Sequence, residues 1–406
     1  MVVPSVRSRV ARGLAAGAAA CALVACSAVP EDAPAAGARE EVARNVILIV
    51  GSGMGRTQHD FLRLAIAGPT GQLAMERLTA SGSVDHVDPV GDTAAGATTL
   101  ASGMPTAPGA IGVDADGEPV ASVLEHARSA GKATGIVTTA EVTDPRTAAF
   151  AAHVAPQNAL EEPAEPEESA VERDIARQYL ERSRVDVIMG GGAARWPADL
   201  LLDARALGYR TVSDVAGLQS VSSDRLLGLF AEGPMFEPGR PGRGQYAPAV
   251  PLPDMTRAAL AALDRRPAGF FLLVDEAGID AMAREGNGAL VLEAGKAWDA
   301  TVQAALEFQA VNPGTLIVVA GDHETGGMSV ELADAGTRVA GADGPFPATD
   351  TDQEIWLRWT RKGPTNAAVP VAAGGPGAEA FQGGMLDTQL FPELLEAMSI
   401  RAGVGS

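Results

Sequence analysis

The chain has little cysteine and a shortage of positive charge, and each shortage excludes a class of protein. Its two cysteines, Cys21 and Cys26, both lie near the N-terminus, so the rest of the chain cannot be held together by disulfides. Acidic residues outnumber basic ones by 51 to 31, giving a formal net charge of −20. Nucleic-acid binding needs a basic face and is therefore excluded. The same acidity disfavours a phosphorylated substrate unless cationic side chains gather in the site.

The N-terminal segment has the features of a targeting signal. Arg7, Arg9 and Arg12 precede an apolar stretch, 14–24, that is too short to span a bilayer. The stretch ends in Leu23-Val24-Ala25-Cys26, which resembles the bacterial lipobox, in which the cysteine is lipidated and becomes the mature N-terminus. An ordinary secretion signal cut nearby is the alternative.

We therefore predict a lipoprotein signal peptide over residues 1–25, lipidation at Cys26 and a flexible tether over 26–43. Removing the signal loses three arginines and no acids, so the mature charge is −20 − 3 = −23. The predicted location is the cell envelope, with the protein anchored by lipid on the outer side of the cytoplasmic membrane or in the periplasm.

Apolar, β-rich runs alternate with helical stretches along the remaining chain. The expected strands are 45–50, 133–139, 185–192, 270–275, 315–323 and 369–373, and the clearest helices are 120–130, 170–184, 255–263 and 288–312. This alternation predicts an α/β fold with a doubly wound, mostly parallel central sheet flanked by helices. We assign it to one domain over 44–402, with insertions near 158–169, rich in Glu and Pro, and near 235–253, rich in Pro and Gly.

An acid and a hydroxyl stand side by side in Gly91-Asp92-Thr93, directly before a run of small residues that can start a helix. Backbone N–H groups at such a start face an anion well, and a hydroxyl nucleophile could lie beneath it. The alternative is an N-capped helix of small residues packed against the sheet.

Several other acids follow the expected strands. Asp275 ends one strand, with Asp280 five residues on, and Asp322-His323 ends another, while Asp144 lies at a comparable turn. Carboxylates and a histidine gathered at one sheet edge suit divalent metals. The alternative is a scatter of acids on an acidic protein, although a carboxylate after an apolar run is costly unless it is paired or ligated.

These residues belong to a series of segments that, in order, resemble the alkaline phosphatase family over about residues 44–400. The matching segments are 45–55, 92–95, 109–114, 147–154, 190–193, 226–231, 270–280, 321–327, 359–360 and 375–378. The resemblance implies hydrolysis of phosphate monoesters through a covalent phosphoryl-enzyme. In that family a hydroxyl nucleophile is flanked by two zinc ions and a nearby magnesium, which clamp the attacking and leaving oxygens.

The resemblance assigns a role to each matching residue. It implies that Thr93, usually serine in the family, is the nucleophile, with Asp92 beside it. The implied metal positions are Asp322 and His323 for the zinc that activates the nucleophile, Asp280 for the other zinc, Asp275 for magnesium and Asp144 as an outer acid near the magnesium.

Five further family positions carry other residues here. Ser52 replaces a metal-bridging aspartate, Arg284 and Pro364 replace zinc histidines, Arg146 replaces a magnesium ligand and Gln157 replaces a phosphate-gripping arginine. Of the five histidines only His323 falls on a ligand position. One carboxylate does not hold zinc, so zinc is expected at one site at most, and neither the second zinc nor magnesium is supported.

We therefore predict a phosphate-monoester hydrolase that acts through a threonine phosphoryl-enzyme with a reduced metal site and weak activity. The alternative is an inactive protein of the same fold that binds phosphate esters, and a homodimer is left open. Arg284 follows Asp280 by one helical turn, so we expect the two to pair. Arg284 could then supply the charge of the lost zinc, or the pair could be a simple ion pair.

Overall fold

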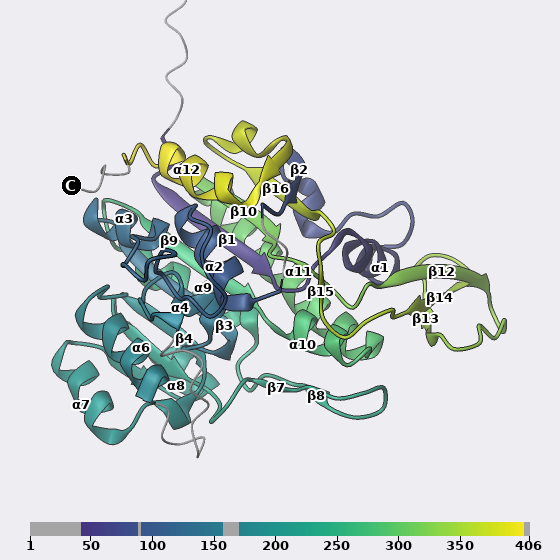
Figure 1. Ribbon diagram of the computed structural model, residues 1–406, viewed down its shortest axis with the longest axis horizontal. Helices are drawn as coiled ribbons and strands as arrows, with labels where there is room; N and C mark the ends of the chain where they lie inside the picture. Colours follow the sequence, from purple (N-terminus) through teal and green to yellow (C-terminus); the bar gives the residue numbers. More distant parts are fainter. Residues whose placement is uncertain (1–41, 88–90, 157–169, 402–406) are drawn as a thin grey trace, which may run out of the picture. The chain divides into compact units, whose positions relative to one another are not determined.

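The computed structural model describes residues 42–87, 91–156 and 170–401. A ten-stranded sheet lies at its centre, in the order β17-β2-β16-β10-β1-β9-β3-β4-β6-β5 (Figure 1). Among the described strands of this sheet, β16 alone is antiparallel to its neighbours, running against both β10 and β2. The bounds are β1 Asn45–Gly51, β2 Ala80–Asp85, β3 Ala133–Glu141, β4 Val187–Gly191, β5 Arg210–Val212, β6 Leu226–Leu229, β9 Phe270–Glu276, β10 Thr315–Gly321, β16 Val369–Gly374 and β17 Gly383–Leu386.

Helices cover both faces of this sheet. Their bounds are α1 Arg56–Ile66, α2 Thr93–Ser102, α3 Val123–Ser129, α4 Pro145–Ala148, α6 Ala170–Glu181, α7 Ala198–Ala206, α8 Val215–Ser220, α9 Leu252–Leu263, α10 Gly278–Arg284, α11 Gly288–Val311 and α12 Asp387–Ala397. Single 3₁₀ turns lie at η1 Ala74–Arg77, η3 Ala193–Arg195 and η4 Ala378–Phe381. The predicted α/β architecture, with a mostly parallel sheet flanked by helices, is confirmed.

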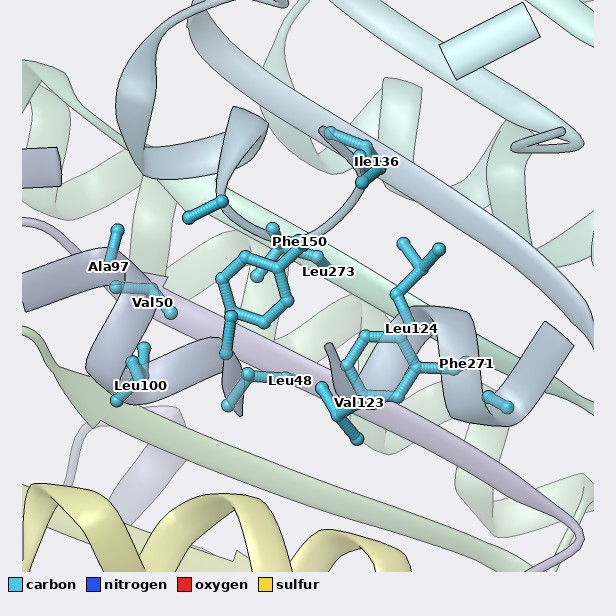
Figure 2. Close-up of a cluster of buried hydrophobic side chains, with 14 of the residues drawn as sticks. Leu48, Val50, Ala97, Leu100, Val123, Leu124, Ile136, Phe150, Phe271 and Leu273 are labelled. Atoms are coloured by element: carbon cyan, nitrogen blue, oxygen red, sulfur yellow. The ribbon is translucent and has the colours of Figure 1, made fainter. Parts of the chain in front are cut away.

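Strand β1 is apolar throughout because both of its faces are covered. Val46, Leu48 and Val50 pack on one side with residues of α2, α3 and α12, a core that Figure 2 shows around Phe150 and Phe271. Ile47 and Ile49 point to the other side, where α1, α9, α10 and α11 supply the partners. The alternation follows from the two-residue period of a strand.

The register of the central strands brings their carboxyl ends to one edge. Gly51 of β1 pairs with Glu276 of β9 and with Gly321 of β10, so the residues that follow these strands emerge together. Ligands bind at this edge in open α/β sheets. The sequence therefore places Ser52, Asp275 and Asp322 side by side, although they are far apart along the chain.

Smaller sheets complete the structure. Strands β12 Ser329–Asp334, β14 Gln353–Arg358 and β13 Asp343–Pro347 form an antiparallel sheet in that order. Two two-stranded pairs join β7 Phe236–Glu237 to β8 Gln245–Tyr246 and β11 Glu324–Thr325 to β15 Pro364–Thr365. The predicted insertion at 235–253 thus contains a β-hairpin, in which Phe236 is buried and the Tyr246 hydroxyl donates to Glu276 at 2.6 Å.

The six strands expected from sequence are all present, whereas β2, β5, β6 and β17 were not predicted. Expected helices differ at their ends: the one at 255–263 begins at Leu252, and the one at 120–130 covers only Val123–Ser129. The 158–169 insertion, the signal peptide and all but the end of the tether lie outside the described residues. Within the described ranges, no helix has the length and apolar character needed to cross a membrane.

Candidate active site

Helix α2 begins at Thr93, directly after the N-cap residue Asp92. The Asp92 carboxylate accepts hydrogen bonds from the backbone N–H of Ala95 at 2.8 Å and of Gly109 at 2.9 Å. Asp92 therefore fixes the start of the helix and ties it to the following loop, as the N-capped alternative predicted. This cap also holds Thr93 at the helix N-terminus, so the two interpretations of the segment are compatible.

Thr93 lines a pocket of about 620 Å³ at the carboxyl edge of the sheet. Asp322, His323, Arg284 and Pro364 line the same pocket. The structure thus brings the nucleophile position together with four other positions that the sequence singled out. His86 and Asp387, which the sequence analysis did not single out, also line the pocket and contact each other at 3.3 Å.

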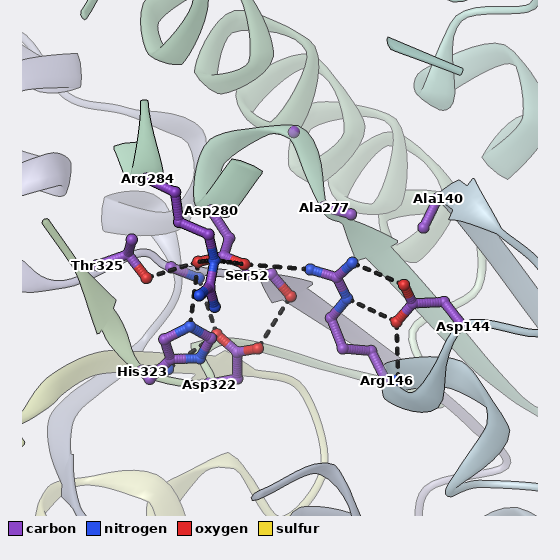
Figure 3. Close-up of polar contacts among 12 residues, drawn as sticks. Ser52, Ala140, Asp144, Arg146, Ala277, Asp280, Arg284, Asp322, His323 and Thr325 are labelled. Carbon is purple, nitrogen blue, oxygen red and sulfur yellow. Dashed lines mark hydrogen bonds and ion pairs between the residues drawn. The ribbon is translucent and has the colours of Figure 1, made fainter. Parts of the chain in front are cut away.

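Ser52 follows β1 and lies between two carboxylates, with its Oγ 2.9 Å from Asp275 and 2.9 Å from Asp322. Figure 3 shows the contact with Asp322. A serine hydroxyl carries one proton, so it can donate to only one of them at a time. The turn that presents Ser52 continues through Gly53, whose φ is 76°. A Cβ at position 53 would lie 2.6 Å from the Cα of Asp280, so only glycine lets α10 approach this turn.

His323 is held between two carboxylates. Its Nδ1 lies 2.9 Å from Asp322 and its Nε2 lies 3.2 Å from Asp280. Burial alone would lower the pKa of His323, but the charges of Asp322 and Asp280 outweigh burial and raise that pKa to about 10. Both ring nitrogens therefore carry protons at neutral pH, and the ring acts as a cation.

Asp280 is the centre of the polar network in Figure 3. Thr325 donates to it at 2.6 Å, Arg284 contacts both of its oxygens through Nε at 3.1 and 3.0 Å, and Arg146 approaches at 3.4 Å. Burial would raise the pKa of Asp280, but His323 and the two arginines hold it well below its usual value. The expected pairing of Arg284 with Asp280 is thus present.

Arg146 occupies the region that the resemblance gave to magnesium. It binds Asp144 with two hydrogen bonds, from Nε and Nη2, each 2.9 Å long. The neighbouring Asp275 accepts from the Thr138 hydroxyl at 2.7 Å. Burial raises the pKa of Asp275 to about 6, against the opposing effects of Arg146 and Thr138.

These donors do not fit the zinc and magnesium that the family resemblance implies. Zinc needs neutral histidine nitrogens and carboxylate oxygens turned toward one point, whereas both nitrogens of His323 are occupied by carboxylates. Arg146 and Arg284 already form ion pairs with Asp144 and Asp280. In the described ranges, no group of three or more His, Cys, Asp or Glu side chains is arranged to hold a metal ion.

Not every predicted site residue can be placed. Gln157 and Cys26 lie outside the described residues, so their roles stay predictions. Pro364 lies in β15, where it pairs with Thr325 of β11 and borders the pocket.

Sequence reasoning missed Thr138 and Thr325, which hydrogen-bond to Asp275 and Asp280. Thr325 stands two residues after His323 in a motif already singled out, so its proximity to the site was a usable signal. The contact between His86 and Asp387 had no such signal, because 301 positions separate the two residues.

Comparison with known proteins places this site in context. The family model described as alkaline phosphatase matches residues 43–355. The streptomycin-6-phosphate phosphatase of Streptomyces griseus is 35% identical over 88% of this chain and 91% of its own length. The alkaline phosphatase of Escherichia coli K12 is 33% identical, with 70% of each chain covered.

Solved structures agree on the fold. Alkaline phosphatase from the Antarctic bacterium TAB5 superposes with a TM-score of 0.73 at 23% identity, covering 89% of this chain and all of that one. The Thermus thermophilus enzyme also gives 0.73, at 22% identity, over 93% of this chain and 96% of its own. At these identities the likeness shows the fold alone.

Proposed function

Because the chain belongs to the alkaline phosphatase family, we propose that the pocket at the start of α2 binds the phosphoryl group of a phosphate monoester, without the family's two-metal hydrolysis. The observation that carries the proposal is that Thr93 and Arg284 line one pocket. A helix N-terminus offers N–H groups that have no partner within the helix, and a guanidinium can grip a phosphate with two hydrogen bonds.

The contacts of Arg284 leave part of its guanidinium available to bind a phosphate group. It contacts Asp280 through Nε, and within the described part of the chain its terminal nitrogens make no hydrogen bond. The side chain is 37% exposed, so these nitrogens can meet a ligand. Asp280 thus positions the guanidinium, and the guanidinium supplies positive charge to an otherwise acidic pocket.

Hydrolysis through Thr93 is the second candidate, favoured by the hydroxyl at the nucleophile position. In that reaction Thr93 Oγ1 forms the bond to phosphorus while the bond to the leaving alcohol breaks. Zinc and magnesium supply nucleophile activation and charge stabilisation in the family. The residues present do not fit these ions, and Arg284 can neutralise charge but cannot activate water. We therefore expect turnover to be weak or absent.

The size and lining of the pocket indicate which kind of phosphate ester it could hold. About 620 Å³ is within the range of sites that enclose a drug-sized ligand and far exceeds a phosphate. Asp387, with His86 beside it, adds negative charge to the wall. One relative is named a streptomycin-6-phosphate phosphatase. We propose an ester whose alcohol is large and polar, with a positive charge.

Binding and turnover can be measured on the same preparations. We expect inorganic phosphate to bind in calorimetry, with affinity falling about 10-fold or more in Arg284→Ala, since a charge-assisted hydrogen bond contributes about 1.5–3 kcal/mol. The exposed Arg257→Ala, outside this pocket, should bind like the unaltered chain. Equal affinity in Arg284→Ala would exclude its phosphate-binding role.

Turnover of p-nitrophenyl phosphate, with metal analysis, decides between the two candidates. We expect no difference between the unaltered chain and Thr93→Ala. Thr93-dependent turnover with about two metal ions per chain, as a two-metal clamp requires, would establish hydrolysis instead. Lipid anchoring at Cys26, export and a homodimer remain separate proposals from the sequence.

A further inference from the structure

We propose that Arg146 serves as a permanently bound cation in place of a divalent metal, so that the carboxylates beside the pocket are held in position without any metal ion. The disagreement between the residues present and the metals of the family leads to this inference. It does not depend on phosphate binding, because it concerns how the acids under the pocket are neutralised.

Contacts within the local chain help to position Arg146. Asp144 is the N-cap of α4 and accepts from the backbone N–H of Arg146 at 3.0 Å. The Arg146 side chain then folds back and grips both oxygens of the same carboxylate. This two-point contact fixes the plane of the guanidinium, which a lysine ammonium could not do.

From that position Arg146 reaches acids supplied by distant strands and helices. Its Nη1 lies 3.4 Å from Asp280 of α10, and its charge also acts on Asp275 at the end of β9. Asp280 and Asp275 are 4% and 2% exposed, so water can hydrate their charges very little. Leaving a buried carboxylate without a counter-charge is strongly destabilising. One side chain therefore contacts two carboxylates, Asp144 and Asp280, and acts on a third, Asp275, through its charge alone.

Acidic and basic side chains pair throughout this network. Arg146 pairs with Asp144 and Asp280, and Arg284 pairs with Asp280 as well. Asp322 lies beside His323 in the same cluster (Figure 3). Ser52 contributes a neutral hydroxyl between Asp275 and Asp322. Removing Arg146 would leave Asp144 without its guanidinium partner and Asp280 with one partner fewer, an imbalance of negative charge beside the buried Asp275.

The test follows from that imbalance. Arg146→Ala should leave Asp144, Asp275 and Asp280 facing an open space, and clustered carboxylate oxygens attract Mg²⁺. We expect the melting temperature of this variant, measured in chelator, to fall and then to rise by at least about 2 °C with millimolar MgCl₂. The unaltered chain should show the same melting temperature with chelator and with MgCl₂, and no heat of Mg²⁺ binding in calorimetry.

A matched control is available in the same protein. Arg195 also bridges two carboxylates, Glu141 at 2.9 Å and Glu172 at 2.7 Å, and is similarly buried. Arg195→Ala should lose stability without a Mg²⁺ response, because Glu141 and Glu172 are 19% and 27% exposed and no further buried carboxylate like Asp275 or Asp280 is paired with Arg195 in the described residues. Should Arg146→Ala fail to fold, Arg146→Lys keeps one charge and should show a smaller loss and a smaller Mg²⁺ response.

Two results would overturn the proposal. One is an unaltered chain that contains stoichiometric metal and loses stability in chelator. The other is a set of Arg146 variants that respond to Mg²⁺ no more than Arg195→Ala does. Neither result depends on phosphate affinity, so failure here is distinguishable from failure of the proposed function.

Discussion

At the scale of single residues, Asp280 shows how much one carboxylate can organise. It accepts contacts from Thr325, Arg284, Arg146 and His323, so its removal would leave three cationic groups without a shared partner. Removing Thr325 would take away only one neutral donor. The two substitutions therefore differ in kind, since one leaves unpaired charges and the other leaves a carboxylate that is still neutralised.

We expect Asp280→Asn to lower the free energy of unfolding by about 3 kcal/mol, because breaking a buried ion pair from one side costs about 3–5 kcal/mol and Arg284 can be partly rehydrated. Thr325→Val should cost only about 1 kcal/mol, the usual value for one hydrogen bond. Denaturant unfolding of both variants measures the difference. Equal losses would show that Asp280 is not the centre of the network.

The same residues show what sequence can predict at this scale. Arg284 and Asp280 are four positions apart, so a helix brings them together and their pairing could be predicted. Arg146 and Asp280 are separated by 134 positions, and only the tertiary fold brings the two side chains into contact. Sequence comparison identified Arg146 as a departure from the family, but it gave no partner for its charge.

At the scale of elements, the start of α2 combines structural and functional roles. Asp92 stands beside the nucleophile position, which could indicate a chemical role, yet its carboxylate caps the helix and binds Gly109. If capping is the role, an asparagine should replace the aspartate well, because its side-chain oxygen accepts the same hydrogen bonds.

We expect Asp92→Ala to lower stability by about 1 kcal/mol, the typical cost of losing an N-cap, and to weaken phosphate binding because Thr93 is no longer held. Asp92→Asn should retain most of both properties. Asp214→Ala removes the cap of α8, away from the pocket, and should cost stability alone. A large loss of binding in Asp92→Asn, at unchanged stability, would instead indicate a direct role for the charge.

The elements that sequence predicted share a physical feature. Strands such as β1, β9 and β10 are buried on both faces, so their continuous apolar runs are conspicuous. Strand β2 is built from small and polar residues and β17 contains two glycines, so neither shows such a run. The antiparallel direction of β16 depends on the segments that connect it to its neighbours, so it could not be predicted from the residues of the strand.

At the scale of the whole molecule, the net charge of −20 opposes the binding of any anion. Such a field acts over about a Debye length and is weakened by salt, whereas contacts inside the pocket are less sensitive. A phosphate ester whose alcohol carries a positive charge would feel less repulsion than one whose alcohol is neutral. The salt dependence of ligand affinity can therefore separate the contribution of the protein's overall charge from that of direct contacts in the pocket.

We expect phosphocholine to bind about 10-fold more tightly than glycerol phosphate at low ionic strength, with the advantage shrinking as NaCl is added. Titration calorimetry over a range of salt concentrations gives both affinities. Asp387→Asn should remove whatever part of the advantage persists at high salt. Identical affinities at low salt would contradict the proposed preference for a cationic alcohol.

The two hydrogen bonds from Arg146 to Asp144 also affect how this site obtains its cation after synthesis. Metal-dependent sites must acquire their metal from the surroundings, and chelators can remove it. The guanidinium of Arg146 is part of the polypeptide, so it is present as soon as the chain has been synthesised. Folding alone would then complete this pocket, and starvation for metal, which disables loaded enzymes, would leave it unchanged.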